Sequence, residues 1–131
     1  MKLVASAADD KRPNPYYAQC PTRQILDRIG DKWAVLVLGR LAEGPVRFNR
    51  LRREIEGISQ KMLSQTLREL ERDGLVHRAA FATVPVTVEY SISPLGQTLV
   101  APIEALSRWA ETHMIDVIAA RERYDEAQQA A

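Results

Sequence analysis

Apolar residues recur every three or four positions along the first half of the chain, in stretches separated by residues that end helices. Residues 21–29 predict a first helix, because Pro21 suits the first helical position and Gly30 suits the end. Asp31 is a suitable cap for a second helix over residues 32–42. This second stretch is apolar nearly all round, so we expect it to be the buried central helix.

Two shorter helices with a tight break between them come next. Residues 47–55 place apolar side chains on one face, and residues 56–58 interrupt the pattern at Gly57. Ser59 is then a suitable N-cap for a helix to about Asp73, and Gly74 is placed to end it. Two short helices joined by a few residues that include glycine are typical of a helix-turn-helix.

After Gly74 the spacing of apolar residues changes from every three or four positions to every second position. Apolar and polar side chains alternate over residues 86–92, and residues 75–82 precede them across a turn that contains proline, which predicts a β-hairpin. Ser93 and Pro94 begin another helix, which we expect Pro102 to kink or divide. An apolar stripe follows as far as Ile118, and the polar segment from Arg121 is expected to fray.

In this order the elements predict a mainly α fold with a small β-hairpin, namely a winged helix-turn-helix with N- and C-terminal dimerisation helices. Residues 1–18 are expected to form a flexible N-terminal arm that becomes ordered near Tyr16 and Tyr17. Residues 19–118 would form the winged domain, including the C-terminal dimerisation helix, and residues 119–131 a polar tail.

The composition suits one compact domain, since the chain has 131 residues of which 46% are apolar. Residues 47–78 hold eight basic and five acidic residues, whereas residues 97–131 hold three basic and six acidic ones. This balance suits a nucleic-acid module followed by a different surface, although ordinary solvated helix faces would give it too. The sequence holds no long apolar span and no secretory signal, so we expect a soluble, cytoplasmic protein without membrane contact.

Cysteine and histidine usage excludes several kinds of site. Cys20 is the only cysteine, which excludes an internal disulfide and a cysteine-rich zinc site. His77 and His113 are too far apart in the sequence for an H-x-x-x-H metal site. The sequence also contains no nucleophile elbow and no phosphate loop, so we expect no enzyme, no metal and no cofactor.

The expected helix after Ser59 has one apolar face and one face of cationic, amide and hydroxyl side chains. Such side chains contact phosphates and base edges in the major groove, where the first turn penetrates deepest. A merely solvated helix face would look similar, but the adjoining turn and hairpin favour DNA. With two flanking arginines, the expected DNA-binding residues are Ser59, Gln60, Lys61, Ser64, Gln65, Arg68, Arg72, Arg47 and Arg78.

Several motifs together resemble the HxlR-type family of bacterial winged-helix regulators. They include Cys20-Pro21, Ile29-Gly30-Asp31-Lys32-Trp33, Gly57-Ile58-Ser59-Gln60-Lys61-Met62-Leu63, Asp73-Gly74-Leu75-Val76 and Val88-Glu89-Tyr90-Ser91. The resemblance covers residues 20–109. It implies a homodimeric DNA-binding transcriptional regulator, most often a repressor, and we expect it to bind an inverted repeat in double-stranded DNA.

The hairpin departs from the family pattern at Thr87, where relatives typically carry a basic residue. Neither Val86 nor Thr87 can pair with a phosphate through charge. Arg78, at the base of the hairpin, is the nearest remaining cation. The resemblance therefore does not extend to a charged wing.

Cys20 directly precedes the first expected helix, where the positive end of the helix dipole lowers the pKa of a thiol. Several relatives use a cysteine at this position to sense oxidants or electrophiles. Cys20 is therefore a redox-sensing candidate for a small-molecule signal. A capping residue that is never modified is an equal alternative.

The C-terminal apolar stripe is longer than a small winged domain can cover alone, and soluble monomers rarely expose a contiguous apolar patch. We therefore expect a homodimer, although the helix could instead fold back onto its own domain. The expected interface residues are Ile25, Ile29, Ile103, Leu106, Trp109, Met114 and Val117.

Two other functions stay open. A winged-helix module could bind proteins without binding DNA, which Thr87 favours and the polar face from Lys61 to Arg68 opposes. A thiol enzyme centred on Cys20 is the third hypothesis, and no further motif supports it.

Overall fold

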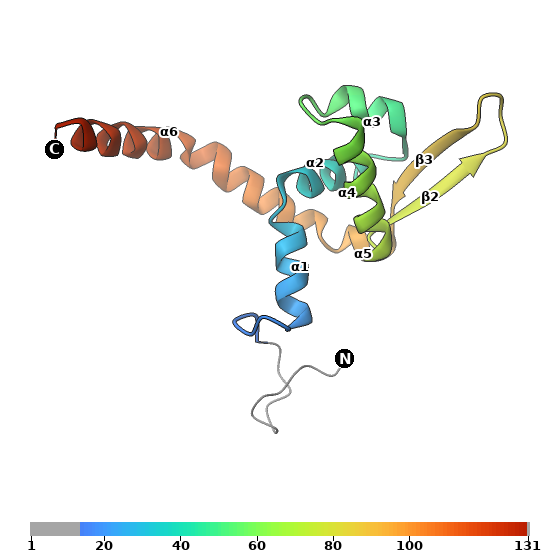
Figure 1. The fold of residues 1–131 in the computed structure, drawn as a ribbon, viewed down its shortest axis with the longest axis horizontal. Helices are drawn as coiled ribbons and strands as arrows, with labels where there is room; N and C mark the ends of the chain where they lie inside the picture. Colours follow the sequence, from blue (N-terminus) through green and yellow to red (C-terminus); the bar gives the residue numbers. More distant parts are fainter. Residues whose placement is uncertain (1–13, 131) are drawn as a thin grey trace, which may run out of the picture.

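The helices and strands follow the order expected of a winged helix-turn-helix in the computed structural model, which describes residues 14–130 (Figure 1). Residues 1–13 of the expected arm lie outside the described residues. The elements are α1 (Pro21–Ile29), α2 (Lys32–Leu41), β1 (Val46–Arg47), α3 (Phe48–Glu54), α4 (Gln60–Arg72), β2 (Val76–Phe81), β3 (Thr87–Ile92), α5 (Pro94–Gln97) and α6 (Val100–Ala130). A mainly helical chain with a small sheet is therefore confirmed.

The expected hairpin is part of a larger sheet with the strand order β1-β3-β2. Strands β2 and β3 pair antiparallel from Val76 opposite Ile92 to Phe81 opposite Thr87. The extra strand β1 pairs with β3 and places Val46 opposite Tyr90. The sequence predicted a helix from Arg47, which was wrong by one residue, because Arg47 belongs to β1 and caps α3.

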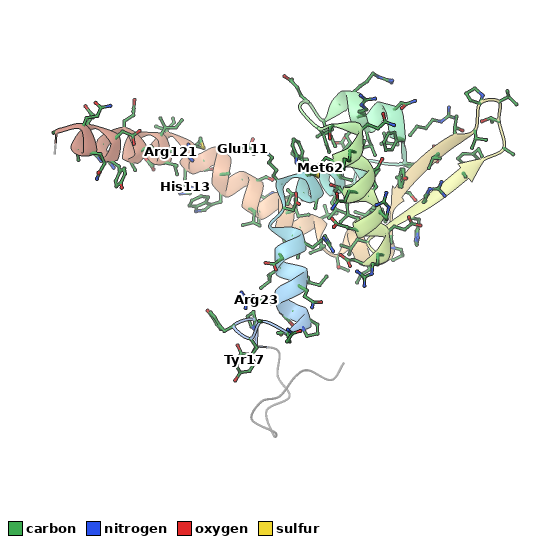
Figure 2. The ribbon with its side chains drawn as sticks, viewed as in Figure 1. Tyr17, Arg23, Met62, Glu111, His113 and Arg121 are labelled. Atoms are coloured by element: carbon green, nitrogen blue, oxygen red, sulfur yellow. The ribbon has the colours of Figure 1, made fainter. Side chains whose placement is uncertain are left out.

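The core lies where α2 and α4 pack together beneath the sheet. Val37, Leu38 and Leu41 of α2 are fully buried, which confirms this helix as the central one. The buried side of α4 consists of Leu63, Thr66, Leu67 and Leu70. Met62, which the helical spacing places beside them, is instead partly exposed at the edge of the stripe (Figure 2).

Local hydrogen bonds fix both ends of α4. The Oγ atom of Ser59 accepts a hydrogen bond from the backbone N–H of Met62 at 3.0 Å, as expected of an N-cap. At the other end Gly74 has φ +77°, a conformation that disfavours residues with a side chain. The backbone N–H of Leu75 then reaches back to the carbonyl of Leu70, which closes a Schellman motif.

The chain between the sheet and α6 is divided at residues 98–99 and not at Pro102. Ser93 caps the short helix α5, because its Oγ atom accepts from Gly96 N–H and donates to the carbonyl of Gly74. Pro102 lies in the first turn of α6, where its missing N–H has no intrahelical partner to lose. The expectation that Pro102 itself divides the helix was therefore wrong.

Helices α1 and α6 extend outward from the core in different directions (Figure 1). Helix α1 has no fully buried residue, and Ile103 is the buried residue of α6. The segment from Arg121, which was expected to fray, continues the helix to Ala130. Despite its 31 residues α6 is not apolar enough to cross a bilayer, and nor is any other helix within residues 14–130.

We predict opposite effects for alanine at two helical glycines. A Cβ atom at buried Gly96 would collide with the carbonyl oxygen of Leu75 and lie 2.7 Å from Cγ1 of Ile92, so Gly96→Ala should lower the free energy of unfolding by about 1–3 kcal/mol. A Cβ at Gly39 meets nothing within 4 Å, so Gly39→Ala should raise it by about 0.5–1 kcal/mol. Urea denaturation of both variants measures these changes, and a neutral Gly96→Ala would contradict the packing of α5.

Candidate nucleic-acid interface

The exposed face of α4 carries the polar side chains that the sequence assigned to DNA. Gln60, Lys61, Gln65, Arg68 and Arg72 are exposed, and Ser64 is half-buried. They lie opposite the buried leucines of the same helix. In the part of the chain that the structure describes, no ion pair engages Lys61, Arg68 or Arg72. Three unpaired positive charges are therefore presented on one helix.

Two acidic residues at the C-terminal end of α4, Glu69 and Asp73, form ion pairs with an arginine from another helix. The Nε atom of Arg28 in α1 lies 2.6 Å from Oδ2 of Asp73, and one terminal nitrogen lies 3.1 Å from Oε1 of Glu69. The hydrogen bond to Asp73, opposed by burial and supported by both carboxylates, raises the pKa of the Arg28 guanidinium. These carboxylates consequently repel an approaching phosphate less than free ones would.

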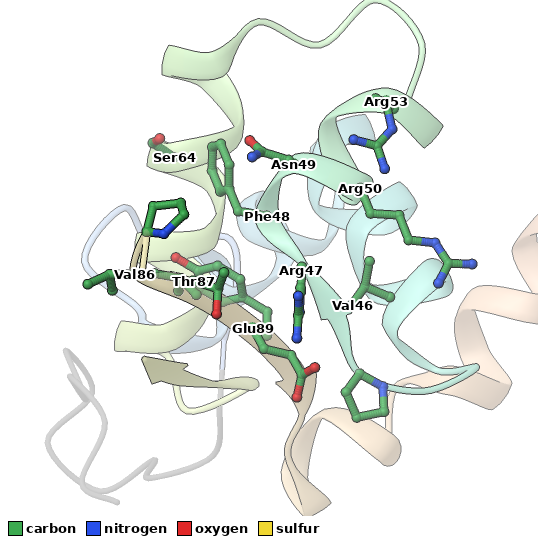
Figure 3. A pocket seen from close by; sticks show the side chains of 14 residues that line it. Val46, Arg47, Phe48, Asn49, Arg50, Arg53, Ser64, Val86, Thr87 and Glu89 are labelled. Atoms are coloured by element: carbon green, nitrogen blue, oxygen red, sulfur yellow. The ribbon is translucent and has the colours of Figure 1, made fainter. Parts of the chain in front are cut away.

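A basic hollow of about 710 Å³ lies between α3 and the wing, the name used here for β2, β3 and the turn between them (Figure 3). Its polar lining comes from β1, α3, α4 and β3. The DNA-binding residues expected from the sequence did not include Asn49, Arg50 or Arg53. The polar lining residues are Arg47, Asn49, Arg50, Arg53, Ser64, Thr87 and Glu89.

One carboxylate, Glu54, holds α2 and α3 together. Nε of Arg40 lies 2.5 Å from Oε1 of Glu54, and Nε of Arg50 lies 2.9 Å from Oε2. Hydrogen bonds from Arg40 and then Arg50 lower the pKa of Glu54, and the bond to Glu54 raises the pKa of Arg40. Arg53 joins no ion pair of residues 14–130, so its charge faces the hollow unpaired (Figure 3).

Arg47 and Arg78, both predicted to contact DNA, lie on opposite faces of the sheet. Arg47 is opposite Glu89 and Arg78 is opposite Tyr90, and neighbouring residues of a strand point to opposite faces. Arg47 lines the basic hollow, whereas Arg78 does not. The structure therefore brings Arg47, but not Arg78, together with the arginines of α3.

The wing carries no charged residue from Ala79 to Val88. Its apolar side chains at Phe81, Val84 and Val86 are exposed. The Oγ1 atom of Thr83 donates to the carbonyl of Pro85 at 2.7 Å and lies 3.2 Å from Oγ1 of Thr87. The hydroxyl of Thr87 thus interacts with another residue of the turn.

Cys20 is the N-cap of α1, as predicted, and its side chain is only 2% exposed. Burial raises the pKa of the thiol, but backbone hydrogen bonds from Arg23, Asn14 and Thr22 outweigh it, so the pKa lies below the ordinary value. Tyr17 and Arg23 lie at the same end of α1 (Figure 2). Cys20 is therefore placed at the end of α1 that projects from the domain, away from α4 (Figure 1).

Apolar side chains are exposed on both helices that leave the core. Leu106 and Trp109 of α6 are 61% and 58% exposed, and Ile25 of α1 is also exposed. The Trp109 ring stacks on His113, with 4.8 Å between the ring centroids. Ile29, Met114 and Val117 are half-buried. Ile103, predicted to lie in a dimer interface, is instead 5% exposed and belongs to the core of its own domain.

Within residues 14–130 no group of three histidine, cysteine or carboxylate side chains is placed to hold a metal ion. Helix α4 with one buried and one polar side, the helix and turn before it and the wing after it have the arrangement of a winged helix-turn-helix. Residues 28–117 match the HxlR-like helix-turn-helix family. The chain belongs to this family. Its members are DNA-binding transcriptional regulators, and the chain is a regulator of the helix-turn-helix type.

Several known regulators resemble the chain over most of its length. YtfH of Escherichia coli (strain K12), an uncharacterised HTH-type transcriptional regulator, is 42% identical over 93% of this chain and 97% of its own. The structure of YtfH from Salmonella typhimurium, a transcriptional regulator, has a TM-score of 0.80 at 41% identity and covers 85% of this chain and 99% of its own. The structure of the redox regulator HypR in its reduced form has a TM-score of 0.69 at 40% identity. The match covers 76% of this chain and 98% of the HypR chain.

Proposed function

We propose that this HxlR-like regulator is a homodimeric repressor that binds an inverted repeat in double-stranded DNA, with α4 of each subunit in the major groove. The observation that carries the proposal is the exposed face of α4. Lys61, Arg68 and Arg72 project from it without an ion pair among the described residues, and Gln65 lies between them. Arginine and glutamine make bidentate contacts with guanine and adenine edges respectively.

The basic hollow supports a phosphate contact beside that groove. Arg47, Arg50 and Arg53 line it next to Ser64 of α4, so a DNA strand that follows the recognition helix would pass these cations. Lysine and arginine contacts to phosphates supply most of the sequence-independent affinity. In this proposal β1 and α3 provide the charge that the wing lacks at Thr87.

The dimer is proposed to form through α6 together with α1. At about 100° per residue, Leu106, Trp109, His113 and Val117 lie within one stripe of α6. This stripe continues beyond the core, where the domain has nothing to cover it (Figure 1). A second copy would bury it together with Ile25, and two recognition helices would then reach half-sites about 34–36 Å apart.

Cys20 is proposed to be the site of an oxidant or electrophile response. Its lowered pKa favours the thiolate, which is the reactive form, and because Cys20 is buried the reaction requires local opening at this end of α1. The redox regulator HypR is among the structures that the chain resembles, which supports this assignment. With one cysteine per chain, oxidation by diamide would remove two electrons and two protons from two thiols, either both Cys20 of a dimer or Cys20 and a small thiol.

The first prediction tests the recognition face. Gln65→Ala and Arg68→Ala should each preserve the fold, because both side chains are exposed, and at least one should weaken specific binding by about tenfold to hundredfold. Duplexes selected from a random pool supply the operator, and fluorescence anisotropy measures its affinity. Arg121→Ala removes a cation far along α6 and serves as the control (Figure 2).

Unchanged affinity and sequence preference in both variants would overturn the assignment of α4. In that outcome the exposed apolar wing of Phe81, Val84 and Val86 would favour the alternative function, a protein-interaction module.

The second prediction concerns the dimer. Leu106→Asp combined with Val117→Asp should give monomers with weaker operator binding, because two charges would have to be buried in the proposed interface. Ile115→Asp is a matched control: Ile115 is 80% exposed but lies about 180° around the helix from Leu106. Light scattering measures the mass. A monomeric wild type at micromolar concentration, or dimers in the double variant, would count against this interface.

The third prediction concerns Cys20. Diamide with a small thiol should change operator affinity of the wild type by at least about tenfold, and Cys20→Ser should abolish the change because the protein then has no thiol that can enter a disulfide. Because the pKa is lowered, the reaction rate should rise with pH and level off at a lower pH than for free cysteine. A Cys20→Ser protein that still responds would refute the role of this residue.

A further inference from the structure

Arg28 links the outward-projecting helix α1 to the last turn of the recognition helix. Its guanidinium contacts Asp73 at 2.6 Å through Nε and Glu69 at 3.1 Å through a terminal nitrogen. Asp73 is the C-cap residue of α4, and Glu69 lies one turn before it. One arginine of α1 therefore contacts two of the carboxylates at the end of α4, those of Glu69 and Asp73.

The geometry of this contact makes it directional. A guanidinium is a planar fork whose donors have fixed relative directions, so two acceptors on one helix define its orientation. The three side chains are partly shielded from water, with 25% of Arg28, 19% of Asp73 and 37% of Glu69 exposed. Such a pair is held in one geometry more firmly than ion pairs between fully exposed side chains.

Little else ties α1 to the domain. None of its residues is fully buried, whereas α4 is anchored by Leu63, Leu67 and Leu70. Helix α1 also packs against α2 across the short link at Gly30, and within residues 14–130 its ion pairs to other helices are those of Arg28. The angle between α1 and α4 consequently depends on Arg28 together with the packing of α1 on α2.

We propose that Arg28 is a positioning residue that sets the distance between the two recognition helices of the dimer. This inference rests on the proposed function, in which α1 forms part of the dimer interface through Ile25. If α1 is fixed against the partner subunit, a change in its angle to α4 moves one recognition helix relative to the other. Arg28 itself contacts Asp73 and Glu69 and not the DNA.

The test measures affinity for inverted repeats whose half-sites are separated by spacers of different length. Wild-type protein should prefer one spacer length, and Arg28→Gln should lose about tenfold in affinity at that length with a flatter dependence on spacing. Affinity for a single half-site should fall by a smaller factor, because the exposed face of α4 is unchanged and only the neutralisation of Asp73 and Glu69 is lost. Arg28→Lys, which keeps the charge but not the fork, should recover only part of the loss.

Three further variants keep the outcome interpretable. Asp73→Asn should reproduce the effect of Arg28→Gln, and the double variant should be no worse than either single one. Glu69→Gln removes only the longer contact of Arg28, so it should change the spacer preference less. This variant replaces Arg28→Gln in the test if Arg28→Gln fails to fold. Arg23→Gln removes an exposed cation from the same helix and should leave the spacer preference unchanged.

Each outcome bears on one claim. An Arg28→Gln protein with the wild-type spacer profile overturns the inference while the proposed function stands. A comparable loss on single half-sites would mean that Arg28 acts on the α4 face or on DNA directly, and it also overturns the positioning role. A wild type that binds no inverted repeat overturns the proposed function itself, and the inference with it.

Discussion

The packing of α2 against the apolar stripe of α4 is the contact on which the other features of this chain depend. Leu38 and Leu41 from α2 and Leu63 and Leu67 from α4 are almost completely buried. Burying a leucine contributes roughly 1.5–3 kcal/mol, so this contact dominates the stability of a small domain. Because the stripe covers only one side of α4, its burial also turns the polar side outward. The same contact thus stabilises the domain and displays the face proposed to read DNA.

The placement of acidic side chains matters as much as that of basic ones. A basic residue near a phosphate gains less if an unpaired carboxylate lies beside it, and in this domain Glu54, Glu69 and Asp73 are paired with arginines. Arg28 forms ion pairs with Glu69 and Asp73, and Arg40 and Arg50 both form ion pairs with Glu54. The exposed cations of α4 therefore stay unpaired. The uncharged wing fits this arrangement, since the arginines of β1 and α3 line the hollow next to it.

The two helices outside the core connect the DNA-facing surface to the rest of the proposed assembly. Both α1 and α6 leave apolar side chains exposed, as the stripe around Trp109 illustrates. Cys20 caps the outer end of α1, and Arg28 near its other end holds the recognition helix. In the proposed dimer, a chemical change at Cys20 would thereby act through α1 on the spacing of the two α4 helices.

The sequence by itself determined the helix boundaries at Pro21, Asp31, Ser59 and Gly74, because caps and terminators act through hydrogen bonds within a few residues. Helical spacing likewise separated the buried and exposed sides of α4, although Met62 lies at the edge. Tertiary structure alone decided what depends on distant partners. Strand β1 exists because two residues pair with β3, Arg28 meets a carboxylate 45 positions away, and strand register separates Arg47 from Arg78. The spacing of apolar residues indicates which side of a helix or strand is buried, but it does not specify which other element packs against that side.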